Sequence, residues 1–147
     1  MPKKNGFDTK ALKGLAEQLD KLGVDSAALC QKLVEEAAEA VLKKQQFDAP
    51  KQAEDKGAWK HLAITEYKKS KKGAYANVGI SAMNWARTDY LYYQHFGYTH
   101  YKSGERVEAH LGWLDNSFNQ MKADIRYRFQ SKLLEAIRKF KVKDGGN

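Results

Sequence analysis

The chain has 147 residues, 42% of them hydrophobic and 30% charged, with only 2 prolines, which is the composition of one folded domain. Its single cysteine, Cys30, excludes a disulfide framework and a cysteine-based metal site. The formal net charge of +8 comes entirely from residues 57–147, because residues 1–56 carry 10 lysines and 10 acidic residues. A basic half of this kind indicates an acidic partner, either nucleic acid or an acidic protein surface.

No targeting signal is expected at the start of the chain. The basic start, residues 1–6, leads into no apolar core, so no signal peptide is expected. No run approaches the ~20 apolar residues that a membrane-spanning helix needs. We therefore expect a soluble protein made in the cytoplasm, with one domain over residues 1–147 and flexible ends at 1–8 and 142–147.

Two helices are predicted first. Leucines and alanines at spacings of three and four predict a short helix over residues 12–22 and a longer one whose apolar stripe covers residues 29–41. Asp25 or Ser26 is the expected N-cap of the longer helix. That helix should stop before Pro50, because the residue that precedes a proline disfavours helical geometry.

A change to β-type composition follows, over residues 62–67 and 75–80, and predicts an antiparallel hairpin. The turn between them is strongly basic and ends in Gly73. Lysines on a turn contact phosphate as point charges without reading sequence. The same lysines can simply keep a hairpin tip in water and guard strand edges. The candidate DNA-facing residues are Lys68, Lys69, Lys71 and Lys72.

The next segment, residues 90–101, is half aromatic and contains Gly97, where a bend is expected. Tyrosine gives a large contact area at low entropic cost, which suits a surface that is wet before assembly and buried after it. The alternative is a half-buried strand or helix end whose hydroxyls reach solvent, and the pattern leaves helix and strand open. The candidate contact residues are Tyr90, Tyr92, Tyr93, His95, Phe96, Tyr98 and Trp113.

The chain ends in one long helix. A strand is expected over residues 107–113, and then apolar residues recur every three or four positions from Leu114 to Phe140. A helix over residues 115–141 would span roughly 40 Å. The order of helices, strands and long helix predicts an α+β fold, with N-terminal helices and a long C-terminal helix packed on a small antiparallel sheet with a basic hairpin.

No catalytic or metal-binding motif is present. A glycine-rich phosphate loop, a Gly-x-Ser-x-Gly elbow and a His-Glu-x-x-His helix are all missing, and the acidic residues are scattered. The histidines lack metal-ligand spacing. We therefore expect no enzyme, no cofactor and no metal. The four histidines are His61, His95, His100 and His110.

Four sequence features follow one another along the chain in a characteristic order. Pro50 stands in the loop after the Leu/Ala-rich helix, and the Asp55-Lys56-Gly57-Ala58-Trp59-Lys60 motif precedes the first predicted strand. The Tyr-rich stretch is Tyr92-Tyr93-Gln94-His95-Phe96-Gly97. The segment that leads into the last helix is His110-Leu111-Gly112-Trp113-Leu114.

In this order, over residues 9–140, the chain resembles a family of small tailed-phage and prophage tail-component proteins, which join or complete the tail at its head-proximal end. Family members carry Asp-Thr-Gly-x-Leu-Arg, a Tyr-rich segment ending in Glu-Phe-Gly-Thr, and a Pro-Phe-Leu element. This chain departs from them by Lys56 for Thr, Trp59 for Leu and His95 for Glu, and by the missing proline near Leu111.

The resemblance implies a virion structural protein at the phage head–tail junction, a neck, tail-completion or connector component synthesised in the host cytoplasm. Its partners would be itself, as a ring of six copies, and the neighbouring connector and tail proteins, with nonspecific contact to double-stranded DNA and none to membrane. Two other functions stay open. One is a sequence-nonspecific nucleic-acid-binding protein, and the other is a small basic ribonuclease or toxin that would use His100, Tyr101 and Arg106.

Overall fold

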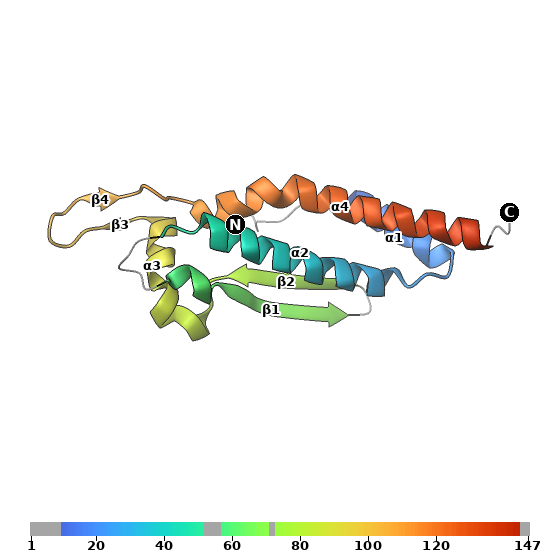
Figure 1. Ribbon diagram of the computed structural model, residues 1–147, viewed down its shortest axis with the longest axis horizontal. Coiled ribbons are helices and arrows are strands. Elements are labelled where there is room, and N and C mark those ends of the chain that lie inside the picture. Colours follow the sequence, from blue (N-terminus) through green and yellow to red (C-terminus); the bar gives the residue numbers. More distant parts are fainter. Residues whose placement is uncertain (1–9, 52–56, 71–72, 145–147) are drawn as a thin grey trace.

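The computed structural model describes residues 10–51, 57–70 and 73–144 and has an α+β fold (Figure 1). The long helix α2 packs against a two-stranded sheet on one side and against the C-terminal helix α4 on another. The elements are α1 (Lys10–Lys21), α2 (Ser26–Asp48), the 3₁₀ helix η2 (Ala58–His61), β1 (Ala63–Ser70), β2 (Gly73–Gly79), the 3₁₀ helix η3 (Ala82–Asn84), α3 (Trp85–Phe96), β3 (Tyr98–Thr99), β4 (Arg106–Val107) and α4 (Trp113–Asp144).

The start of α2 is fixed by Asp25. Its backbone is extended, and its Oδ1 accepts a hydrogen bond of 3.1 Å from the backbone N–H of Ala28, as an N-cap does. Ser26, the other predicted cap, is instead buried and donates its hydroxyl to Oδ1 of Asp20 at 2.6 Å. The helix ends at Asp48, two residues before Pro50, as predicted.

The hairpin of β1 and β2 is antiparallel, with Ala63 opposite Gly79 and Ser70 opposite Gly73, and an irregularity between Ile64 and Glu66. Its strands confirm the predicted pair. The hydroxyl of Tyr67 donates to the backbone carbonyl of Gln31 in α2 at 2.8 Å. This bond ties β1 to the helix that covers the sheet.

The prediction of a strand over residues 107–113 is wrong. Only Arg106–Val107 is extended, and it pairs with β3. Tight turns take the rest of the segment. The N–H of Leu111 donates to the carbonyl of Glu108 and that of Trp113 to the carbonyl of His110, while Gly112 has a φ of 72°. The long helix therefore begins at Trp113, slightly before its predicted start.

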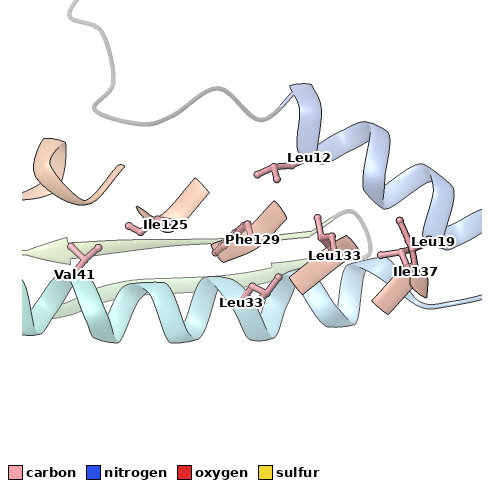
Figure 2. Close-up of a cluster of buried hydrophobic side chains, with 8 residues drawn as sticks. All are labelled: Leu12, Leu19, Leu33, Val41, Ile125, Phe129, Leu133 and Ile137. Atoms are coloured by element: carbon pink, nitrogen blue, oxygen red, sulfur yellow. The ribbon is translucent and has the colours of Figure 1, made fainter. Parts of the chain in front are cut away.

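The main hydrophobic core lies where α1, α2 and α4 meet (Figure 2). α4 contributes every third or fourth residue to it, in keeping with the apolar repeat in the sequence. A second, smaller cluster joins the end of α2, η2, α3 and the first turn of α4. No helix in the described part of the chain is long and apolar enough to cross a membrane. The main core is Leu12, Leu19, Leu33, Val41, Ile125, Phe129, Leu133 and Ile137.

Candidate interaction surface

Helix α3 presents four large aromatic side chains together, which we call the aromatic cluster: Trp85, Tyr92, Tyr93 and Phe96. Each is between 38% and 54% exposed. The ring centroid of Tyr92 lies 5.0 Å from that of Trp85, 5.6 Å from that of Tyr93 and 4.7 Å from that of Phe96. Such spacings are the edge-on and tilted packing that aromatic rings prefer. The cluster is therefore one continuous aromatic surface rather than separate side chains.

The opposite face of α3 explains why this segment is a helix. Leu91, Thr88 and Gln94 are buried there, at spacings of three that fall on one side of a helix. The hydroxyl of Thr88 donates to the carbonyl of Asn84 at 2.8 Å. Because these buried residues face the second hydrophobic cluster, Tyr92 and Tyr93, which lie between Leu91 and Gln94, are turned outward.

Trp113 was predicted as a contact residue, but it is buried, with 6% of its surface exposed. Its indole N–H donates to the carbonyl of Leu91 at 3.0 Å, inside the second cluster. This bond joins the start of α4 to the middle of α3. Trp113 thus packs beneath α3 in the second cluster and is not part of the exposed aromatic surface.

His95 has a similar structural position. Its side chain is only 10% exposed. Its Nδ1 accepts a hydrogen bond of 3.2 Å from the backbone N–H of Leu114, which lies in the first turn of α4, where backbone N–H groups have no partner within the helix. Its Nε2 lies 3.7 Å from Oδ2 of Asp115, and its carbonyl accepts the N–H of Gly112 at 2.7 Å. Of the predicted contact residues, Tyr90 and Tyr98 are also partly buried, and Tyr90 packs on the second cluster.

Beyond the aromatic cluster the chain leaves the body as a hairpin, residues 97–112, which we call the arm. Figure 1 shows it projecting beyond α3, away from the long helices. The arm contains β3 and β4, joined by a turn in which the N–H of His100 donates to the carbonyl of Glu105 and that of Gly104 to the carbonyl of His100. Tyr101, near its tip, is 86% exposed.

The predicted basic loop is described in part. Lys68 and Lys69 are exposed on β1, whereas Lys71 and Lys72 lie outside the described residues. The ammonium of Lys68 lies 3.2 Å from Oε1 of Glu66, and this hydrogen-bonded carboxylate raises the pKa of Lys68. The ammonium of Lys69 lies 5.8 Å from the ring centroid of Tyr67. Both lysines thus have contacts within the hairpin.

A groove that the sequence did not predict runs between α1, α2, β2 and α4. Its volume is about 590 Å³, and its lining is mainly apolar. Cys30 lines it, and burial, together with the carboxylate of Asp20, raises the pKa of this thiol. Within the described ranges, no three histidine, cysteine or acidic residues are grouped so that they could hold a metal ion.

Trp85 is the member of the aromatic cluster that sequence reasoning missed. It lies seven residues before Tyr92, which is one face of a helix, but that spacing has meaning only once a helix is assumed. Comparison with family models, with curated protein sequences and with solved structures found no match to this chain.

Proposed function

We propose that this chain is a structural protein of a tailed phage or prophage virion, which assembles at the head–tail junction as a ring of identical copies. The aromatic cluster carries the proposal. Four large rings in mutual contact, each about half in water, form the kind of apolar patch that marks a protein–protein contact. Tyrosine and tryptophan are also the residues that contribute most at such contacts.

The resemblance of the sequence to neck and tail-completion proteins is the reason for proposing the head–tail junction as the site of assembly. A ring needs a heterologous contact, in which one surface of a copy meets a different surface of the next. It needs no catalytic residue and no cofactor, in keeping with the absence of catalytic motifs from the sequence. The excess positive charge of residues 57–147 suits a ring through which double-stranded DNA passes, because contact with phosphate does not depend on sequence.

The decisive experiment joins particle labelling to a double substitution. Antibody against the protein should label purified virions only at the head–tail junction. In the Tyr92→Ala/Tyr93→Ala variant, the isolated protein should keep its helical circular dichroism spectrum, because both side chains are exposed on α3, but the label should be lost from particles.

The matched control is Tyr127→Ala. This tyrosine lies on α4, outside the aromatic cluster, and is 73% exposed. This variant should be incorporated like the wild type. Normal incorporation of the Tyr92/Tyr93 variant would remove the aromatic cluster from the assembly contact. Absence of label from all particles would remove the virion role itself.

The exposed Lys68 and Lys69 favour one second candidate, a sequence-nonspecific nucleic-acid-binding protein. In that case the isolated protein should bind duplex DNA with an affinity that falls steeply with salt. Lys68→Glu/Lys69→Glu should weaken the binding about tenfold or more, as the loss and reversal of two phosphate contacts implies. Unlabelled particles together with this result would favour the second candidate.

A further inference from the structure

The apolar groove has a free strand edge as one wall. β1 and β2 form a sheet of two strands in the described chain, so the edge of β2 away from β1 has no neighbouring strand. Residues 74–78 of β2 line the groove opposite Phe118, Ile125 and Phe129 of α4. Peptide groups along a free edge are a ready template for another chain segment.

A buried polar atom also lacks a partner there. Gln45 lines the groove with only 3% of its surface exposed. Its Nε2 donates to the carbonyl of Val78 at 3.3 Å, whereas its Oε1 has no hydrogen-bond partner among the described residues. A buried acceptor without a donor is costly, but this oxygen is closed to solvent, so it lies behind the wall of the groove and an occupant does not reach it.

The arm, by contrast, is a pair of short strands with no covering helix in the described chain. Its sheet consists of two residue pairs, Tyr98 with Val107 and Thr99 with Arg106. A two-stranded hairpin without a covering helix is at best marginally stable in water. The β1–β2 hairpin has α2 as its cover, but the arm projects away from the helices (Figure 1). Near its tip, Tyr101 offers an aromatic ring and a hydroxyl donor to whatever covers it.

We infer that the arm of one copy enters the apolar groove of a second copy, with Tyr101 as the anchor and its ring against the apolar walls. This inference rests on the proposed function, because it supplies the two unlike surfaces that a ring contact needs. The arm leaves the body beside α3, and the groove lies along α2, so the contact is heterologous.

The available area supports a second copy as the occupant. The aromatic cluster ends at Phe96, and the arm begins at Gly97, so the two surfaces are continuous. Since such side chains bury about 150–250 Å² each, the exposed parts of the cluster and of Tyr101 amount to on the order of 500 Å². A stable interface needs about 800 Å² from each partner, and the other exposed arm residues can supply the remainder.

Cys30 provides the test, because it lines the groove and is the only cysteine in the chain. The rate of its alkylation by iodoacetamide would be measured at one pH over a range of protein concentrations. We expect a several-fold fall in the rate as the concentration of the wild type rises and grooves become filled. A rate that does not depend on protein concentration would overturn the inference.

Three variants identify the arm as the occupant. Replacing residues 100–105 by Asn-Gly joins the paired Thr99 and Arg106 with a two-residue hairpin loop and removes the tip. This variant, and Tyr101→Ser, should show no concentration-dependent protection of Cys30. Tyr101→Phe keeps the ring that packs on the apolar walls, so the concentration that gives half-protection should stay close to that of the wild type.

Tyr127→Ser is the matched control, since that exposed tyrosine lies on α4 and does not line the groove. It should protect Cys30 like the wild type. Protection that persists in both tip variants would overturn the arm as the occupant. Loss of protection in the control would overturn the groove as the site. If protection persists in both tip variants while Tyr92→Ala/Tyr93→Ala still removes the protein from particles, the inference about the arm fails and the proposed function stands. If the arm protects Cys30 but particles carry no label, the virion role fails.

Discussion

At Gly97 the chain turns from α3 into the arm, and this residue must be glycine. Its φ of 77° and ψ of 162° belong to a region that side chains with a Cβ essentially do not adopt. A Cβ there would also lie 2.9 Å from Nη2 of Arg106 and 3.1 Å from the carbonyl oxygen of Val107. The guanidinium of Arg106 is held at that place by the carbonyl of Phe96. One residue thus sets the direction in which the arm leaves the body.

Gly97→Ala should therefore lower the free energy of unfolding by about 1–3 kcal/mol, the cost of one strained backbone conformation. Urea unfolding followed by circular dichroism would measure it. The matched control is Gly14→Ala, inside α1, where a Cβ would meet nothing within 4 Å. That change should stabilise the protein by about 0.5–1 kcal/mol, because alanine favours a helix interior. Equal effects at the two glycines would contradict the role assigned to Gly97.

At the scale of elements, α4 connects the two hydrophobic clusters. Its first turn enters the smaller cluster through Trp113, and its later turns fill the main core with Ile125, Phe129 and Leu133. Figure 2 shows Ile125, Phe129 and Leu133 of α4 among core side chains of α1 and α2. The helix is long because it must reach both clusters, and its stability comes from this packing more than from helix propensity.

Leu133→Ala tests that dependence. Leu133 is fully buried in the main core, so its truncation should lower the free energy of unfolding by about 2–5 kcal/mol through lost contacts and the cavity left behind. Leu111→Ala is the control, since Leu111 is exposed before α4 begins, and it should change stability by no more than about 0.5 kcal/mol. Thermal and urea unfolding of both variants would decide. A similar loss in both would mean that α4 is not held by the core.

At the scale of the whole molecule, packing is dense at one place and sparse at another. α1, α2 and α4 share the main core, whereas the arm carries a sheet of two residue pairs beyond α3 (Figure 1). Local stability follows the number of buried apolar contacts. The chain should therefore open in the arm long before it opens in the helices.

Amide hydrogen exchange should show this difference along the chain. In dilute protein, residues 98–107 should exchange almost at the rate of an unstructured peptide, and residues 125–137 of α4 should exchange slowest, because opening them requires loss of the main core. Exchange read by mass spectrometry on peptides from both regions would test the difference. Protection of the arm equal to that of α4 in a monomer would contradict it.

The sequence predicted the elements whose signals are local. Asp25 starts α2 with its side-chain cap, Pro50 stops it by disfavouring helical geometry in the residue before it, and the unbroken apolar repeat marks α4. The state of residues 90–96 stayed open because tyrosine suits a strand, while the helix is imposed by the burial of Leu91 and its neighbours. Residues 107–113 were wrongly assigned to a strand, because tight turns override their composition.

The candidate surface was predicted only in part. Tyr92, Tyr93 and Phe96 are exposed together, but Trp113 and His95 contribute to the packing beneath them. Whether an aromatic residue is a contact or a core residue depends on how closely α3 and α4 approach, which a single sequence does not encode locally. The apolar groove was missed for the same reason, since its walls come from separate segments of the chain.

The short distance between Trp85 and two tyrosines has a spectroscopic consequence. The ring centroid of Trp85 lies 5.0 Å from that of Tyr92 and 6.2 Å from that of Tyr93, so light absorbed by these tyrosines passes to the indole and is emitted there. Trp113, by contrast, is enclosed and hydrogen-bonded, and its emission reports on the interior. A partner that covers the aromatic cluster would move the emission of Trp85 to shorter wavelength, so the protein carries its own fluorescent label for following assembly.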